Sequence, residues 1–308
     1  MPNDSMTPTY QSSRGSVPAA STGVAPETRG TALEFLRLLA MEVSNGTVDL
    51  PCFPDVVVRI RHALANPGTT TEKTVAIVGN EPRLSARLLQ TANSAAFNTS
   101  GKPLTDLRTA ITRLGQQLVQ SAAVAYAVQQ LKQAPSLRSI AKPLNELWRD
   151  CISVASVSQA VAERTKIGPD EAFLTGLLHG IGRLYIMVRA VGNAEKFGSD
   201  QSFLDLVADW HASIGKAVLE NWGFAESMCN AVGDQDNQER RRSHGDELSD
   251  VLAVSVVLAA AMKSPSSPPA AAEQIRAFQH LGLTEQDCAA ILIQARRHLG
   301  SLHEALGG

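Results

Sequence analysis

The sequence predicts an all-α protein, on three observations. Apolar residues recur at intervals of three and four along most of the chain, which is the period of a helix with one buried face. The alternation of apolar and polar residues that marks a half-buried strand is hard to find. Aromatic residues make up only 5% of the chain, while Ala, Leu and Val are abundant. With 308 residues, the chain is long enough for a large helical core in one or two domains.

The composition also argues against several functions. The formal net charge is −2 and the pI is about 6.4, so we expect no partner that is nucleic acid or an anionic membrane. No stretch has the roughly 18 uninterrupted apolar residues of a membrane span, and the start does not resemble a secretory signal. Cys52, Cys151, Cys229 and Cys288 are isolated in the sequence, which fits free thiols in a reducing compartment. We therefore expect a cytoplasmic protein.

The first elements are a tail and a helix. Residues 1–29 are rich in Ser, Thr and Pro and have almost no large apolar side chains, so we expect a disordered N-terminal tail. The next segment has Leu33, Leu36, Leu39 and Val43 at helical spacing. It predicts an amphipathic helix that ends near the Asn-Gly pair that follows.

Turn and cap signals divide the rest of the first half into further helices. Gly115 is expected to close one of them. The helices are expected to start at Pro54, at Thr70 or Thr71, near Asn80 to Pro82, at Thr105, and at about Gln116.

The second half follows the same pattern, with Thr284 as the expected cap of the last helix. The expected helices run around Trp148 to Val161, from Asp170 to Met187, from Ser202 through Val218, from about Glu247 to Met262, near 271–280, and over 285–306.

The segment from Asp170 to Met187 reads DEAFLTGLLHGIGRLYIM and is the most informative of these. Pro169 suits a first helical position because its missing N–H would be unpaired there, and the two acidic residues that follow complement the helix dipole. Apolar residues at helical spacing predict burial, and His179 lies inside this run.

Four motifs occur in order: LPCFPDVVVRI, NEPRLSARLLQTANSAAF, LRTAITRLG and GLLHGIGRL. Together they resemble the successive signatures of the HDOD family, from about Leu50 to Asp236, with Glu81 in place of the usual Asp. The last motif also resembles GLLHDIGKL, the metal-binding heart of the HD phosphohydrolases. The resemblance implies a two-lobed helical bundle whose second lobe derives from the HD fold. It also implies a role in bacterial signalling, often beside cyclic-di-GMP or two-component modules.

On this basis we expect three parts. Residues 1–29 form the tail, and residues 30–263 form the HDOD-like domain, with lobes of about 30–140 and 141–263. Residues 264–308 supply C-terminal helices packed on the second lobe.

The resemblance also directs the search for a metal site. In HD enzymes a His-Asp pair binds the metal, but here Gly180 stands in place of the Asp. His179, His211 and Asp236 match ligand positions, and only Ala stands near 258–260, where an HD enzyme has its final Asp. A catalytic metal needs about three protein ligands and an open position. We therefore expect a non-enzyme with no catalytic residue, no metal and no cofactor, in which these three positions are vestigial.

The two histidines then need structural roles. We expect His179 to be a core histidine bonded to a backbone carbonyl, and His211 to be a partly exposed helix residue. Asp150 stands near a place where related sequences often have a His, and we expect it to be a solvated or capping carboxylate.

The function that this pattern predicts is a signalling adaptor that acts through protein contacts. A response regulator, a histidine kinase or a cyclic-di-GMP enzyme is the expected partner. Two alternatives remain open: a residual HD phosphohydrolase or phosphodiesterase, and a nucleotide-binding receptor without turnover. The sequence does not specify the oligomeric state.

Two surfaces are candidates for partner binding. One is a cleft between the lobes, with Asn93, Ser94 and Phe97 on one side and His179 to Arg183 on the other. Its mixed character suits the core of an interface. Alternatively, Asn93 and Ser94 hold the bundle together through buried hydrogen bonds.

The second surface is the polar loop Asp234–Leu248, whose charges of both signs suit steering and rim contacts. The expected rim contacts are Arg240, Arg241 and Arg242.

Overall fold

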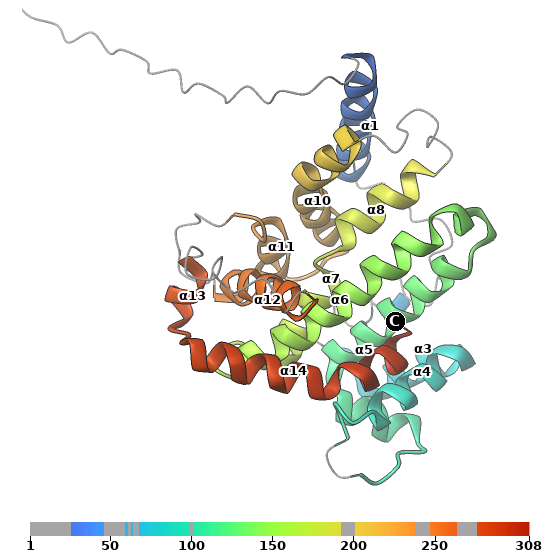
Figure 1. Ribbon diagram of the computed structural model, residues 1–308. Helices are drawn as coiled ribbons and strands as arrows, with labels where there is room; N and C mark the ends of the chain where they lie inside the picture. Colours follow the sequence, from blue (N-terminus) through green and yellow to red (C-terminus); the bar gives the residue numbers. More distant parts are fainter. Residues whose placement is uncertain are drawn as a thin grey trace, which may run out of the picture.

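The structure is a computed structural model, which describes residues 26–45, 59–60, 63, 68–98, 101–191, 201–237, 247–263 and 276–307. Within these ranges the side chains of residues 26–32, 201–203 and 206 are not described. All regular structure in the described ranges is helical (Figure 1), which confirms the predicted fold class. None of the described helices is long and apolar enough to cross a membrane.

The elements follow one another along the chain in this order: α1 (Pro26–Ser44), α3 (Thr71–Gly79), α4 (Pro82–Asn93), α5 (Leu107–Gln133), the 3₁₀ helix η1 (Pro135–Ile140), α6 (Ala141–Ala162), α7 (Pro169–Leu178), α8 (Ile181–Ala190), α10 (Gln201–Asn221), α11 (Glu226–Gly233), α12 (Glu247–Lys263), α13 (Arg276–Leu281) and α14 (Glu285–Leu306).

Side-chain caps determine where several helices begin, because the first backbone N–H groups of a helix have no partner inside it. The Thr70 hydroxyl accepts from the N–H of Lys73 at 3.3 Å, and Thr284 forms a reciprocal capping box with Asp287. Both caps confirm the sequence prediction. At α5 the cap is Asp106, one residue after the expected Thr105.

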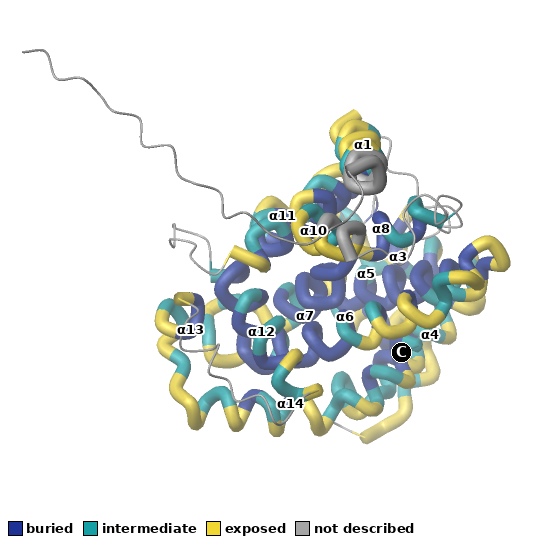
Figure 2. The backbone as a smooth tube through the Cα atoms, turned by 45° about the horizontal axis from the view of Figure 1, so that its top comes forward, coloured by how far each residue is buried: buried dark blue, intermediate teal, exposed yellow. Residues whose placement is uncertain are grey.

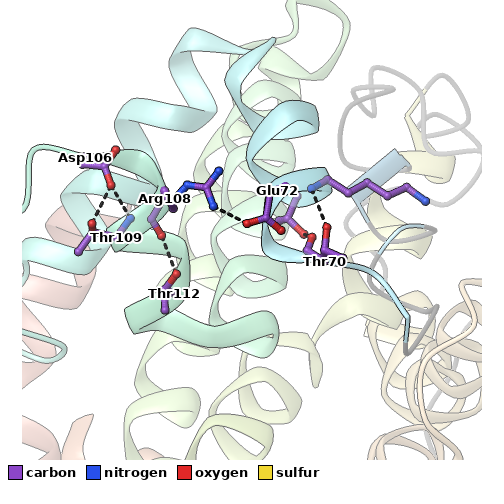
Figure 3. Close-up of polar contacts among 8 residues, drawn as sticks. Thr70, Glu72, Asp106, Arg108, Thr109 and Thr112 are labelled. Atoms are coloured by element: carbon purple, nitrogen blue, oxygen red, sulfur yellow. Dashed lines mark hydrogen bonds and ion pairs between the residues drawn. The ribbon is translucent and has the colours of Figure 1, made fainter.

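Figure 3 shows how α3 and α5 are joined beside these caps. The Asp106 carboxylate accepts from the backbone N–H and the hydroxyl of Thr109, both at 2.7 Å. Arg108, in the first turn of α5, forms an ion pair with Glu72 of α3. Both partners of this ion pair are exposed, so its contribution to stability is small.

Helix α5 is bent at Gly115, where φ is 72° and ψ is 174°. Residues other than Gly rarely adopt a positive φ, so Gly115 permits the bend. The two helices expected on either side of Gly115 are therefore the two arms of one kinked helix.

The predicted single helix from Asp170 to Met187 is wrong, because α7 ends at Leu178 and α8 begins at Ile181. The two halves pack on different neighbours, α7 on α6 and α8 on α10. The short turn between them lets each half meet its own partner, and it places His179 and Gly180 at the junction.

The core is centred on α6, which packs against α7, α12 and α14. Figure 2 shows α6, α7 and α12 as largely buried. At one end α3 and α4 pack on α5, and at the other α10 packs on α8, α11 and α1. Residues 238–246, 264–275 and most of 46–67 lie outside the described part, and with them the loop arginines, Cys52 and the helix expected to begin at Pro54.

The position of α1 differs from the expected division into lobes. The helix begins at Pro26, inside the segment predicted as a tail, and it lies on α10 rather than among the helices of the first half. The Arg189 Nη2 of α8 donates to both carboxylate oxygens of Glu42, at 2.6 and 2.7 Å. The boundary between the lobes at about residue 140 stays a prediction. Helix α1 precedes this boundary in the sequence but packs on α10, a helix of the expected second lobe.

Helix α14 packs along α6, and its C-terminal end reaches α4 and α5 (Figure 1). The last carbonyls of a helix lack partners inside the helix and carry partial negative charge. The side chains that donate to them include Arg87 Nη1 to Ala305 at 2.6 Å, Trp148 Nε1 to Leu306 at 3.0 Å, and Lys132 Nζ to Gly307 at 2.8 Å. The C-terminal helix therefore contacts both expected lobes, not the second alone.

Candidate functional site

Two of the three vestigial ligand positions, His211 and Asp236, are in contact, although all three come from different elements. His179 follows α7, His211 belongs to α10, and Asp236 follows α11. The Nε2 of His211 lies 3.0 Å from Oδ2 of Asp236. His179 is near enough for the charges of His211 to influence its pKa and for His179 to influence that of Asp236. We call these three residues the vestigial site.

Two glycines of the GLLHGIGRL motif bring the helices around this site together. A Cβ added to Gly176 would lie 2.7 Å from Cα of Ala155 in α6. A Cβ added to Gly182 would lie 1.9 Å from the carbonyl oxygen of His211 in α10. Neither position has room for a side chain, so these two glycines permit the backbone contacts on which the site depends.

His179 is buried, with 8% of its surface exposed, and its Nδ1 donates to the carbonyl of Gly176 at 2.7 Å. Its own carbonyl accepts from Nε2 of Gln235 at 3.1 Å. Burial lowers the pKa of His179 to about 4, so the imidazole is neutral at physiological pH. The expectation of a core histidine bonded to a backbone carbonyl is confirmed.

Gly180 occupies the place of the missing carboxylate, and its surroundings are filled. A Cβ at this position would lie 2.7 Å from Sγ of Cys151 and 3.0 Å from Cδ1 of Leu147. Burial raises the pKa of the Cys151 thiol to about 12, so it is not a thiolate ligand at physiological pH. An Asp at 180 would therefore have to displace two side chains of α6.

The expectation that His211 is partly exposed is wrong, since only 2% of its surface is exposed. The close packing of α10 on α8 at Gly182 buries it. Its Nε2 lies 3.0 Å from Asp236 and also 3.0 Å from Nη2 of Arg183. Its Nδ1 is buried without a hydrogen-bond partner among the described residues.

Sequence reasoning placed Arg183 at the wall of a cleft and did not connect it with His211, whose Nε2 it contacts. We call Arg183, His211 and Asp236 the arginine cluster. The hydrogen bond from His211 lowers the pKa of the Asp236 carboxyl, although partial burial opposes this shift, and the charges of His211 and then Arg183 lower it further. Asp236 is thus an anion at physiological pH, next to a guanidinium.

Two further carboxylates lie on α6 and α12. Asp150 forms an ion pair of 2.5 Å with Lys263, and its side chain is partly exposed, as expected for a solvated carboxylate. Asp250, with 1% of its surface exposed, lies 3.3 Å from Nδ1 of His280 on α13. Sequence reasoning missed this second pair, although an acidic residue directly before the apolar run of α12 was a signal.

The residues expected to line a cleft have clear local roles. The amide of Asn93 bonds both backbone groups of Leu104, accepting from its N–H at 2.7 Å and donating to its carbonyl at 2.8 Å. Ser94 donates to the carbonyl of Thr91 at 2.8 Å. Phe97 packs edge-on against Phe173 of α7, with ring centroids 5.7 Å apart. These contacts favour a structural role for Asn93 and Ser94, and the cleft itself stays a prediction.

The helical fold and the altered ligand set together define a protein of HD-like architecture. Comparison with known families agrees, because the model of the HDOD domain matches residues 50–238. The chain belongs to the HDOD family.

Solved structures of similar fold come from several bacteria. A proposed metal-dependent phosphohydrolase from Shewanella amazonensis SB2B superposes with a TM-score of 0.70 at 22% identity, covering 90% of this chain and 99% of that one. A proposed signal transduction protein from Marinobacter aquaeolei VT8 gives a TM-score of 0.61 at 20% identity, covering 92% and 67%. At these identities the likeness establishes the fold.

A relative of uncharacterised function from Treponema pallidum (strain Nichols) is 24% identical over 204 residues. The match covers 63% of this chain but only 39% of the relative, so the chain spans less than half of that protein's length.

Proposed function

We propose that this HDOD-family chain is a non-catalytic adaptor in bacterial signal transduction, which acts through protein contacts in the cytoplasm. The observation that carries the proposal is the arrangement of the arginine cluster. The nitrogen of His211 that a metal ion would require lies 3.0 Å from a guanidinium nitrogen and 3.0 Å from a carboxylate oxygen.

The donor set does not fit a catalytic metal, for three reasons. Gly180 supplies no carboxylate, and the space beside it is filled by Leu147 and Cys151. A metal-bound histidine normally donates its second ring N–H to a carbonyl or carboxylate, but Nδ1 of His211 has no such partner in the described part of the chain. In addition, Nε2 of His211 is already engaged by Arg183 and Asp236.

An adaptor role agrees with the family and with the description of the Marinobacter protein as a proposed signal transduction protein. The expected partners are a response regulator, a histidine kinase or a cyclic-di-GMP enzyme. We place the contact in the predicted cleft around Phe97 and Arg183, with the loop arginines as rim contacts.

One observation favours the second candidate, a residual phosphohydrolase. Because Nδ1 of His179 donates to the carbonyl of Gly176, its Nε2 carries the free lone pair, which is how metal-binding histidines are held. Some proteins of similar fold are also proposed phosphohydrolases. One well-oriented imidazole is fewer than the three ligands that a catalytic centre needs.

Affinity purification of the tagged chain from its native cell, followed by mass spectrometry, tests the adaptor role. We expect a stable complex with a signalling protein, while the purified chain neither hydrolyses cyclic dinucleotides nor retains stoichiometric metal by elemental analysis. Tightly held iron, manganese or zinc together with turnover would reject the adaptor role in favour of the phosphohydrolase. Saturable nucleotide binding without turnover would instead identify a receptor.

A further inference from the structure

We propose that the guanidinium of Arg183 takes the place of a metal ion in this fold, as a built-in cation that joins α8, α10 and the segment after α11. The inference concerns the stability and metal response of the chain and does not depend on its partner. It begins from the disagreement between the vestigial site and the requirements of a metal.

The first step is the convergence of three elements on one nitrogen. Arg183 lies in the first turn of α8, His211 in the middle of α10, and Asp236 three residues after the end of α11 at Gly233. Nε2 of His211 is 3.0 Å from both the guanidinium and the carboxylate. Segments that are distant in sequence are thus linked through one imidazole, as ligands are linked through a bound cation.

The second step is that this nitrogen has no lone pair to offer to another cation. If His211 carries its proton on Nδ1, Nε2 accepts a hydrogen bond from Arg183. If the proton is on Nε2, the ring donates to Asp236 instead. In either tautomer a protein group engages Nε2, so a metal could bind only by displacing it.

The third step is that the backbone fixes Arg183 in this place. Its neighbour Gly182 touches the backbone of His211 so closely that no side chain fits between them. The backbone of Arg183 is therefore held near the imidazole by packing, and its exposed side chain reaches His211 from the solvent side. Arg183 does not depend on a flexible loop to reach its partners, so the cation is part of the folded structure.

The fourth step is the charge balance between Arg183 and the remaining groups of the vestigial site. Since Gly180 stands where HD enzymes have a ligand carboxylate, the vestigial site keeps one anion, Asp236, beside the buried ring of His211. One positive charge on Arg183 offsets one negative charge on Asp236. A divalent metal would leave an excess of positive charge, whereas a guanidinium balances the remaining anion.

A double-mutant cycle on the full chain tests the proposal, with Arg183→Gln, Asp236→Asn and the double variant compared by thermal unfolding. We expect each single change to lower the midpoint by about 2–4 °C. The loss in the double variant should be smaller than the sum of the two, because the pair is coupled. Arg183→Lys keeps the charge and should lose less than Arg183→Gln. Arg108→Gln is the matched control, because it removes another exposed arginine, from an ion pair with Glu72 that has no buried imidazole between its partners.

The second measurement is the response of the wild-type chain to metal. After chelation, both proteins are titrated with Zn²⁺ or Mn²⁺, and the wild-type chain should bind no more metal than the His211→Gln variant. The thermal midpoint of the wild-type chain should be the same with and without EDTA. Strictly additive effects of Arg183→Gln and Asp236→Asn would overturn the proposal. Stoichiometric binding by the wild-type chain that His211→Gln abolishes would also overturn it. Neither measurement involves a partner, so the adaptor function is tested separately.

Discussion

Gly182 of α8 meets the backbone of His211 in α10, and a Cβ built on Gly182 would lie 1.9 Å from the carbonyl oxygen of His211. It would also lie 2.7 Å from the backbone nitrogen of Gly215, so two glycines face each other at the crossing of the two helices. Because both obstacles are backbone atoms, the clash cannot be relieved by a change of rotamer. The crossing point therefore sets how closely the arginine cluster can assemble.

The first prediction concerns this crossing. Gly182→Ala should lower the free energy of unfolding by about 3 kcal/mol or more, at the upper end of what overpacking costs. Gly300 in α14 is the control, since a Cβ there meets nothing within 4 Å and its φ is not positive. Gly300→Ala should raise stability by about 0.5–1 kcal/mol, because Gly loses more entropy in a helix than Ala. Denaturant unfolding measures both, and equal effects would contradict the packing argument.

The second prediction is a pH dependence that originates at His179. Its folded-state pKa of about 4 is below the ordinary value of 6.5, so between these pH values the unfolded chain binds a proton that the folded chain does not. Stability should then rise with pH across this interval, by up to about 1.4 kcal/mol per pH unit, and level off above it. Unfolding of the wild-type chain at several pH values from 5 to 7.5 measures the slope.

His179→Ala is the control for that slope. The variant should be less stable at pH 7 by about 1–3 kcal/mol, because it loses the hydrogen bond to Gly176 and leaves a cavity. Its slope between pH 5 and 6.5 should be smaller than that of the wild-type chain, with a remainder because burial lowers the pKa of His303 in the same direction. A variant of normal stability that no longer bound its partner would instead make His179 a binding residue.

The third prediction concerns the end of α14. Arg87 donates to the carbonyl of Ala305 at 2.6 Å, which holds the last turn of α14 on α4. Arg87→Ala should lower the free energy of unfolding by roughly 1.5–3 kcal/mol, the usual range for a hydrogen bond to a charged group. Arg83→Ala removes an exposed arginine of the same helix and should change stability by no more than about 0.5 kcal/mol. If Arg87→Ala and Arg83→Ala lowered the free energy of unfolding equally, the bond from Arg87 to α14 would contribute nothing to stability.

The fourth prediction separates the two candidate binding surfaces. Phe97→Ala should abolish partner binding in a folded variant, because its ring lies at the predicted cleft. Charge reversal of Arg240, Arg241 and Arg242 should mainly slow association and change its salt dependence. Surface plasmon resonance at several salt concentrations measures both. If the reversal eliminates binding while Phe97→Ala binds normally, the interface lies on the loop.

Much of the local structure could be predicted from sequence, because it depends on residues within one or two turns. The caps at Thr70 and Thr284 and the interruption of the helix at Gly115 are of this kind. The bond from His179 to Gly176 spans only three residues, so a helical segment with a buried histidine was enough to predict a bond to a backbone carbonyl, although not which carbonyl. The family could also be predicted, since its motifs are local strings.

The sequence by itself therefore determined the helical class, most helix positions and the loss of the ligand carboxylate at Gly180. The tertiary structure alone decided the break between α7 and α8, the burial of His211, the place of α1 on α10, and the approach of Arg183 and Asp236 to His211. These features depend on which helix faces meet, and that is settled by close contacts between distant residues such as Gly182 and His211. Helical periodicity shows that a face is buried, but it does not show against what.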